Sequence, residues 1–351
     1  MGLDKKCYVA VSGGVDSAVA LTLIKQNGYS AEGVTMTVFD SELVPTYNER
    51  ELDDAKALCE RLGVPHHTID LKKEFYNKVI TDFISSYGRG ETPNPCIVCN
   101  RFLKFGALAD YCFKNGADVY ATGHYVRVLT SGDRKIIARA KDEKKDQSYM
   151  LWSLTPDQIS RFYAPLGEFS KDEVRAIDLN LGLAVATKGD SQDICFIPDG
   201  DYRAFLNRTA GDTDFIGDFV HTNGKILGKH LGQRSYTIGQ RKGLGIAYTE
   251  PLYVVGRDMA KNQIILGSND DLFVSEFRVR SANFSAIDYP TGDFRCEVKI
   301  RYHAPAVDCI LHPIEDGIIL VKTATPVRAV TPGQSAVFYS DDILLGGGVI
   351  C

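Results

Sequence analysis

"AVSGGVDSAVALTLI", residues 10–24, joins a predicted buried strand to a predicted helix through a turn rich in glycine. The apolar segment ends in Ser12-Gly13-Gly14, and a helical pattern starts at about Ser17. Glycine lets the backbone bend tightly and approach a ligand, and a helix N-terminus favours negative charge, so the turn suits a phosphate group. It is not a Walker A loop, because no lysine stands where that motif reaches the β- and γ-phosphates, and it is not G-x-G-x-x-G.

Strand-like and helical segments alternate from Lys6 to about Asp199. Strands are predicted at 6–11, 31–39, 66–70 and 117–123, and helices are predicted to begin near Ser17, Glu51, Leu71 and Arg101. Two more helices are predicted at 156–163, capped by Thr155 with a proline just inside, and at 171–181. This alternation predicts an α/β domain, in which a mainly parallel sheet carries helices on both faces.

The pattern becomes β-rich after Asp201. Short β segments punctuated by glycine, such as "SYTIGQ" and "LYVVGRD", are followed by longer alternating runs. In "RCEVKIRY", Cys296 and Val298 share one face with Ile300 and Tyr302, which is strand periodicity. About 80 residues of this kind suit a small β-barrel. We therefore predict an N-terminal catalytic domain, a small central β-rich domain and a C-terminal β-barrel, at 1–207, 208–271 and 272–351.

Composition and charge exclude several classes of protein. The 351 residues contain no apolar run long enough for a membrane span, and nine scattered cysteines do not resemble a secreted disulfide framework. We expect a cytoplasmic chain with reduced thiols and no membrane partner. The net charge of -5 argues against a uniformly basic nucleic-acid binder, but residues 219–249 carry five basic and no acidic residues. That segment predicts an RNA-backbone contact through Arg241 and Lys242, or else a solvated basic loop.

The complete S-G-G-x-D-S motif resembles the loop of the ATP-pyrophosphatase (PP-loop) superfamily. Members of that superfamily cleave ATP between the α- and β-phosphates and transfer AMP to a substrate oxygen. The resemblance implies ATP and Mg²⁺ as cofactors, with Asp16 positioning the magnesium or the triphosphate. The ATP-binding residues that it implies are Ala10, Val11, Ser12, Gly13, Gly14, Val15, Asp16, Ser17, Met36 and Gly123.

Six further motifs resemble the bacterial tRNA-specific 2-thiouridylase family. They are "TPNPCIVCNRFLKFGAL", "ATGHYVR", "KDQSYML", "SQDICFI", "GQRKGLGI" and "TPGQSAVFY", in this order over nearly the whole chain. The resemblance implies a tRNA-uridine 2-sulfurtransferase that adenylates the C2 oxygen of the wobble uridine and replaces it with persulfide sulfur. Its implied partners are the anticodon loop of tRNA and a persulfide donor protein, and no DNA.

Two thiols carry the implied chemistry. The family motifs assign Cys99 as the nucleophile and Cys195 as the persulfide carrier, which close into a transient disulfide. With a helix beginning near Arg101, we expect the helix dipole and nearby Lys104 to lower the pKa of Cys99. The motifs also imply that Asn94, Pro95 and Cys96 line the target-base pocket and that tRNA is contacted by His124, Lys145, Asp146, Gln147, Arg301, Tyr302 and Gln334.

Cys96 leaves the mechanism open, because many relatives carry aspartate at this position. In the favoured account no metal is bound, and Cys96 is a spare thiol beside the base. In the alternative, Cys96, Cys99 and Cys195 hold a [4Fe-4S] cluster with one open iron. A zinc site would need a second ligand pair, which the sequence lacks. Two other functions also remain, a PP-loop ligase that adenylates a small molecule and a non-catalytic RNA-binding protein.

Overall fold

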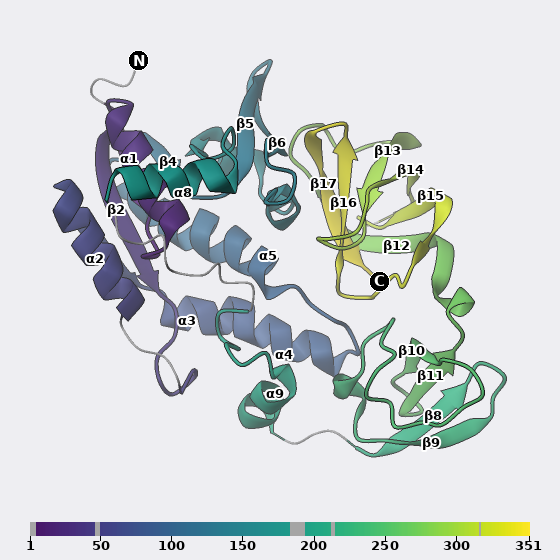
Figure 1. Ribbon diagram of the computed structural model, residues 1–351. Coiled ribbons are helices and arrows are strands. Elements are labelled where there is room, and N and C mark those ends of the chain that lie inside the picture. The colour runs from purple at the N-terminus through teal and green to yellow at the C-terminus, as the bar shows by residue number, and fades with distance from the viewer. Residues whose placement is uncertain (1–4, 46–49, 183–193, 212–214, 316) are drawn as a thin grey trace.

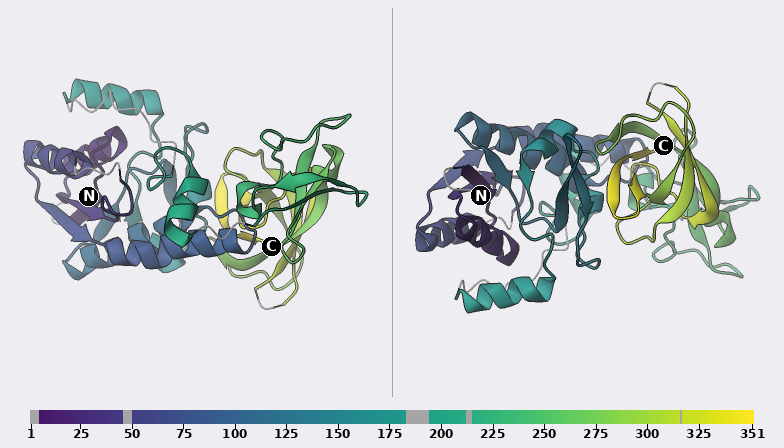
Figure 2. Two further views of the ribbon diagram at one scale, coloured as in Figure 1. Left: turned by 90° about the horizontal axis from the view of Figure 1, so that it is seen from below. Right: turned by 90° about the horizontal axis from the view of Figure 1, so that it is seen from above.

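The computed structural model describes residues 5–45, 50–182, 194–211, 215–315 and 317–351. The N-terminal part forms an α/β layer structure, and two β-rich parts follow it (Figure 1). Figure 2 shows from two further sides that the α/β part and the C-terminal barrel lie next to each other.

The N-terminal sheet is parallel and has its first strand at its centre. Its order is β3-β2-β1-β4-β7, with β1 (Lys6–Ala10), β2 (Ser30–Thr37), β3 (His66–Asp70), β4 (Val119–Ala121) and β7 (Phe162–Tyr163). Cys7, Tyr8 and Val9 of β1 are fully or almost fully buried. Burial of successive residues, which point to opposite faces, means that both faces of the sheet are covered. The predicted strands are confirmed to within a few residues at their ends.

Helices pack on each face of this sheet. One face carries α1 (Val15–Gln26), α2 (Arg50–Leu62) and α8 (Lys171–Asn180), whose Ala18, Leu58 and Val174 share a core with Cys7 and Val9. The other face carries a chain of short segments whose apolar side chains pack with Tyr8. These segments are α3 (Lys72–Phe75), η1 (Tyr76–Ile80), α4 (Thr81–Gly88), α5 (Pro95–Cys99), η2 (Asn100–Leu108), α6 (Ala109–Lys114) and, further along, η3 (Ser148–Leu151) and α7 (Pro156–Ser160).

One predicted helix start is wrong. The sequence placed it near Arg101, but α5 begins at Pro95, where the Asn94 side chain accepts a hydrogen bond from the Cys96 N–H at 3.2 Å. Asparagine at the N-cap followed by proline at the first helical position is a strong start signal, so Cys96 and Cys99 lie inside a helix. The capping predicted at Thr155 is confirmed, although α7 ends at Ser160 because Phe162–Tyr163 form β7.

The central part has its own sheet and core. α9 (Tyr202–Ala210) leads into a sheet of order β10-β11-β8-β9, with η4 between β9 and β10, and Phe219, Tyr236 and Val254 fill the core. The elements are β8 (Gly217–His221), β9 (Ile226–His230), η4 (Gln233–Ser235), β10 (Tyr253–Asp258) and β11 (Gln263–Gly267). The predicted division after residue 207 falls inside α9.

The C-terminal part closes into a barrel. Its strand order is β12-β15-β14-β13-β16-β17, and β12 also pairs with β17. Cys296 and Cys309 lie opposite each other on β13 and β14, with their sulfur atoms 3.5 Å apart. The elements are η5 (Asp270–Leu272), β12 (Phe273–Phe284), β13 (Phe294–Lys299), β14 (Val307–Pro313), β15 (Ile319–Arg328), β16 (Ser335–Ser340) and β17 (Ile343–Ile350).

A hairpin of the N-terminal part extends the barrel sheet. The hairpin, β5 (Val126–Ser131) and β6 (Arg134–Arg139), pairs with β17 through Ala138 and Ile343, and the Arg139 N–H donates to the Asp342 carbonyl at 2.8 Å. The sequence analysis missed this hairpin. It ties the catalytic part to the barrel, and the indole N–H of Trp152 adds a hydrogen bond to Ser335 Oγ at 2.9 Å.

The loop before α5 touches both β-rich parts. The Thr92 N–H donates to the Pro332 carbonyl at 2.8 Å, and Arg257 of β10 donates to the Thr92 hydroxyl at 3.2 Å. The Glu91 carboxylate pairs with Arg89 at 2.8 Å and with Arg280 of the barrel at 2.9 Å. We call residues 89–94 the junction loop, because it connects all three parts next to the cysteine-bearing helix.

Glu91→Gln should lower the free energy of unfolding by about 1 kcal/mol, since it removes both ion pairs of a side chain that is only 12% exposed. Urea unfolding followed by the fluorescence of Trp152, the single tryptophan, would measure the change at this interface. Glu276→Gln breaks an exposed pair with Lys322 and serves as the control, with an expected loss below about 0.3 kcal/mol. Equal losses in the two variants would contradict a special role for the junction loop.

Candidate functional site

The phosphate turn is shaped by its own hydrogen bonds. The Ser17 hydroxyl donates to the Gly14 carbonyl at 2.9 Å and accepts the Ser12 N–H at 3.2 Å. Gly13 has a φ of +70°, and a Cβ on it would lie 2.7 Å from the Glu51 carbonyl oxygen. Only glycine fits there without strain, so the turn at the end of β1 is formed before any ligand binds.

The two residues predicted to border adenosine lie at the carboxyl edge of the sheet. Met36 lies near the end of β2, half-buried against the larger N-terminal core. Gly123 follows β4, and a Cβ there would lie 2.9 to 3.0 Å from the backbone of Asp16 and Ser17. Ligands of open parallel sheets bind at this edge, so the position agrees with the prediction, although ATP contact by these residues remains a prediction.

Asp16 has two partners that the sequence analysis missed. The Tyr125 hydroxyl donates to Asp16 Oδ1 at 2.7 Å, and Lys171 Nζ lies 2.7 Å from Oδ1 and 2.9 Å from Oδ2. Lys171 stands at the first position of α8, about 150 residues from Asp16 in the chain. A helix start at that point could be recognised, but no local signal indicates which helix α8 packs against.

The thiols of Cys96, Cys99 and Cys195 come close enough to influence one another electrostatically. Cys96 and Cys99 share α5, whereas Cys195 precedes Phe196, which anchors its segment edge-to-face against Phe83 at 5.3 Å. Solvent reaches Cys96 and Cys195, and Cys99 is half-buried. The arrangement brings together the two thiols that the family motifs single out, from segments almost 100 residues apart.

The expected low pKa of Cys99 is wrong. The surrounding protein desolvates the thiol and raises its pKa to about 11, against a smaller lowering by Lys104. The same cause raises the pKa of Cys195 to about 12 and that of Cys96 in the same direction. Cys99 lies inside the helix rather than just ahead of it, so the helix N-terminus does not offset burial. Although Cys96 and Cys195 reach solvent, dense protein on their other sides sets the direction of the shift.

Lys104 is the cation that acts on all three thiols. It lowers the pKa of each, and together with burial it holds the pKa of His124 well below its usual value. His124 is therefore neutral, with Nδ1 2.7 Å from the Thr122 hydroxyl and its ring 5.7 Å from that of Phe105. This histidine follows Gly123 directly, so residues 123 and 124 connect the phosphate turn to the thiols.

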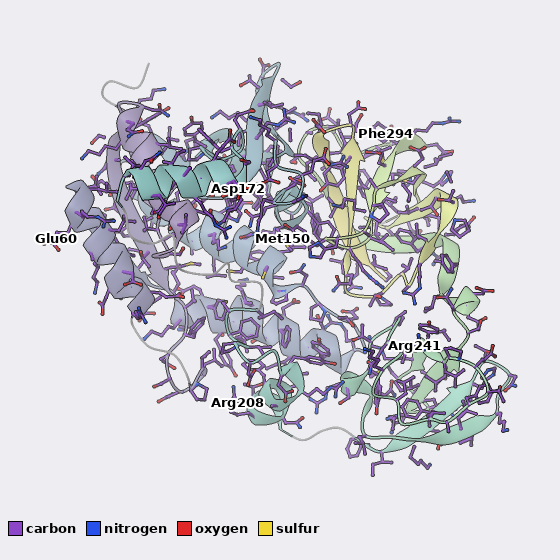
Figure 3. All side chains as sticks on the ribbon, in the orientation of Figure 1. Glu60, Met150, Asp172, Arg208, Arg241 and Phe294 are labelled. Carbon is purple, nitrogen blue, oxygen red and sulfur yellow. The ribbon has the colours of Figure 1, made fainter. Side chains whose placement is uncertain are left out.

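Asn94 and Pro95 support the helix that carries the thiols. Asn94 caps α5 and also donates its amide to Met150 Sδ at 3.6 Å, while Pro95 is buried. Figure 3 shows Met150 next to α5. Contact of Asn94, Pro95 and Cys96 with a target base remains a prediction.

Most residues predicted to touch tRNA join parts of the chain to one another. Asp146 is buried, its carboxylate accepts the Ala140 N–H at 3.0 Å, and its carbonyl accepts the Tyr302 hydroxyl at 2.8 Å. The remaining contacts run from Gln147 to the Tyr125 N–H, from Arg301 to Ala329 and Thr331, and from Gln334 to the Thr92 carbonyl. Lys145 is half-exposed beside them. Their contact with tRNA is untested.

The basic segment is smaller on the surface than in the sequence. Arg241 and Lys242 are exposed on a loop of the central part (Figure 3). Arg234 is buried, and Lys229 pairs with Asp218 at 2.6 Å. Tyr236, which could have stacked on a base, packs edge-to-face on Phe219 at 5.1 Å inside the core.

Known proteins match the chain along almost its whole length. Residues 5–199 match the family model "tRNA methyl transferase HUP domain", 203–268 the "tRNA methyl transferase PRC-barrel domain" and 274–350 the "Aminomethyltransferase beta-barrel domain". The tRNA-specific 2-thiouridylase MnmA of Syntrophotalea carbinolica is 46% identical over 350 residues, covering 99% of each chain. Its counterpart in Clostridium acetobutylicum is 41% identical over 356 residues, covering 99% of this chain and 100% of the relative.

The chain belongs to the tRNA-specific 2-thiouridylase family. The resemblance seen in the motifs and the predicted fold class are confirmed. The solved U34-tRNA thiolase NcsA from Methanococcus maripaludis with its [4Fe-4S] cluster is 18% identical and covers 59% of this chain and 67% of that chain, with a TM-score of 0.36. A likeness this low carries no argument about a cofactor of the 2-thiouridylase.

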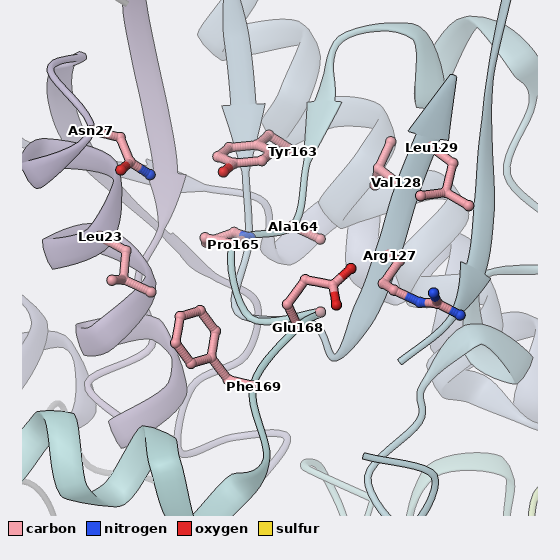
Figure 4. A pocket seen from close by; sticks show the side chains of 11 residues that line it. Leu23, Asn27, Arg127, Val128, Leu129, Tyr163, Ala164, Pro165, Glu168 and Phe169 are labelled. Carbon is pink, nitrogen blue, oxygen red and sulfur yellow. The ribbon is translucent and has the colours of Figure 1, made fainter. Parts of the chain in front are cut away.

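Three further searches of the described residues frame the site. Among them, no group of three or more His, Cys, Asp or Glu side chains could hold a metal ion, and no helix is long and apolar enough to cross a membrane. A surface pocket of about 280 Å³ lies at the far end of α1, between Leu23, Arg127 and Phe169 (Figure 4). It is not the phosphate site, because the phosphate turn precedes the opposite end of the same helix.

The raised pKa of Cys99 predicts how its reactivity depends on pH. Because the thiolate is the reactive form, alkylation of Cys99 by iodoacetamide should quicken about tenfold per pH unit from pH 7 to 10, without a plateau. Mass spectrometry of the peptide that contains Cys99 would give the rate. In the urea-unfolded chain the same peptide should level off above about pH 8.5. A plateau near pH 8 in the folded protein would contradict the burial of the thiol.

Proposed function

We propose that this chain is a tRNA-uridine 2-sulfurtransferase that uses ATP to convert the wobble uridine of tRNA to 2-thiouridine. The observation that carries the proposal is the meeting of Cys99 and Cys195 beside a phosphate turn of the S-G-G-x-D-S type. The contacts of Gly123 with Asp16, and of His124 with Lys104, link the turn to the thiols. The names and identity of the curated relatives support the same reaction.

The first chemical step makes the C2 oxygen a leaving group. The oxygen attacks the α-phosphorus of ATP, the bond to the β-phosphate oxygen breaks, and pyrophosphate leaves. The backbone N–H groups of Gly13 and Gly14 and the hydroxyls of Ser12 and Ser17 line the turn that would bind the phosphates. Asp16, 35% exposed at its side chain, would hold Mg²⁺ with the phosphate oxygens, and the ion would neutralise their charge.

The second step moves sulfur. A donor first leaves a persulfide on Cys195, and its terminal sulfur attacks C2 while the C2–oxygen bond breaks and AMP departs. Cys99 then attacks the Cys195 sulfur, which forms the Cys99–Cys195 disulfide and leaves the second sulfur on the base as thiocarbonyl. An external thiol reduces the disulfide. The raised pKa of Cys99 means that it must lose a proton to react, and the ammonium of Lys104 favours that loss.

Cys96 is a bystander in this account. The [4Fe-4S] alternative needs Cys96, Cys99 and Cys195 as three ligands, whereas persulfide transfer needs Cys99 and Cys195 alone. The descriptions of the matched family models mention methyl transfer, but transfer from a methyl donor requires neither cleavage of ATP nor a second thiol. We therefore favour thiolation through a persulfide over the cluster, over methylation, and over a small-molecule ligase or a non-catalytic RNA binder.

Nucleoside analysis of bulk tRNA tests the proposal. With ATP, a persulfide donor and iron-free buffer, the protein should yield 2-thiouridine, AMP and pyrophosphate. Cys99→Ser and Cys195→Ser should each lose at least about 100-fold in thiolation, because each removes one sulfur of the relay. Cys96→Ala and the exposed-thiol control Cys351→Ser should stay active.

The products separate the alternatives. ADP and phosphate would contradict the PP-loop assignment, and AMP without modified tRNA would indicate the ligase. Loss of thiolation in Cys96→Ala, together with an absorbance band near 400 nm in anaerobically reconstituted wild type, would favour the cluster.

The exposed basic pair should bind the RNA backbone. Replacing Arg241 and Lys242 by alanine should weaken tRNA binding about tenfold or more and reduce the slope of log affinity against log salt by about two. Filter binding at several salt concentrations would measure both. Lys25→Ala/Lys114→Ala removes two exposed charges from the α/β part and is the matched control. Equal effects of the two double variants would show that only net charge matters.

A further inference from the structure

Lys171 brings a positive charge to a phosphate turn that has none in its own sequence. Residues 10–17 contain no lysine or arginine. The Lys171 ammonium makes both contacts to Asp16 described above, and its side chain is only 8% exposed. Taking an ammonium out of water costs several kcal/mol unless partners replace the water. A lysine held at this point therefore needs an explanation beyond surface charge.

The position of Lys171 is fixed by the start of α8. Ser170 and Glu173 form a capping box, and the Lys171 N–H donates to Asp142 Oδ2 at 3.0 Å. The ammonium also lies 5.8 Å from the ring centre of Tyr125, which itself holds Asp16. The backbone of Lys171 is thus anchored, while its long side chain can change partner by rotation alone.

The proposed reaction requires the carboxylate of Asp16 for magnesium, yet both of its oxygens already face Lys171. A magnesium ion and an ammonium cannot share the same two oxygens at these distances without repulsion. When Mg²⁺ and ATP arrive, the ammonium has to leave Asp16. The nearest anionic groups are then the phosphates, bound in the turn directly before Asp16.

We propose that Lys171 is the phosphate-binding cation of this site. It neutralises Asp16 while the turn is empty and pairs with the β- and γ-phosphates when ATP is bound. As the bond between the α-phosphorus and the β-phosphate oxygen breaks, the electron pair passes to that oxygen, and the ammonium stabilises the charge that develops there. A lysine from a distant helix thus takes the place of the lysine that a Walker A loop supplies locally. The inference rests on the proposed function, because it takes ATP as the substrate.

A purely structural ion pair between α1 and α8 would behave differently. Such a pair would change stability but would not distinguish between ligands that share a site. A phosphate-binding lysine discriminates, because pyrophosphate and α,β-methylene-ATP carry the phosphates that it contacts and AMP does not.

Equilibrium binding to the full chain, with Mg²⁺ and without tRNA, tests the inference. Lys171→Gln should weaken α,β-methylene-ATP and pyrophosphate by roughly 10- to 100-fold, the usual worth of a charge-assisted hydrogen bond, and leave AMP within about twofold. Lys171→Arg should recover part of the loss. Lys141→Gln, an exposed neighbour, is the control and should bind like wild type. An equal change for all three ligands, or no change, would overturn the role of Lys171.

A second measurement covers the case in which Lys171→Gln folds poorly. Without Mg²⁺, Asp16→Asn frees Lys171 and should tighten pyrophosphate binding several-fold. In Asp16→Asn/Lys171→Met that gain should vanish, and a gain that survives would overturn the inference. If wild type binds neither α,β-methylene-ATP nor pyrophosphate, the proposed function fails together with it. If wild type binds both and Lys171→Gln binds them equally well, only the role of Lys171 fails.

Discussion

The burial of β1 on both faces is the constraint on which the rest of the molecule depends. A strand hidden in this way, paired in parallel with β2 and β4, has to release the chain at one edge of the sheet. The release occurs in a turn with a left-handed glycine, packed so tightly against α2 that another residue would clash. The start of α1, the approach of Gly123 to its backbone and the position of Asp16 all follow from that turn.

The thiols lie in a setting that keeps them quiet until they are needed. Burial raises the pKa of each thiol, and the neighbouring thiols add repulsion between thiolates at Cys99 and Cys195, so the resting site holds neutral sulfur. Lys104 opposes this from within the same helical run, and neutral His124 adds no charge. Such a site resists oxidation, because oxidants attack thiolates. A reactive form arises when a substrate or donor alters the surroundings.

Local signals in the sequence predicted most elements of the fold, and tertiary contacts explain what they missed. Strand periodicity located β1 to β4, and caps located α7 and α8. The start of α5 was missed although Asn94-Pro95 is a local signal, because the apolar pattern was given more weight. The β5–β6 hairpin, the Lys171–Asp16 pair and the buried carboxylate of Asp146 depend on segments far apart in the chain. The pKa of Cys99 was predicted in the wrong direction because burial, which sequence periodicity does not measure, outweighs the helix dipole.

The continuity of β6 with β17 has a consequence for how the chain can be divided. Removing the barrel would leave β6 as an open edge strand, with unpaired N–H and C=O groups on the side that Ile343 and Asp342 now cover. It would also uncover the indole of Trp152, which packs against Gly347 of β17. A shortened chain ending before β12 would therefore present a sticky edge beside an apolar face, the combination that promotes self-association. The α/β part thus relies on its own C-terminus to stay monodisperse.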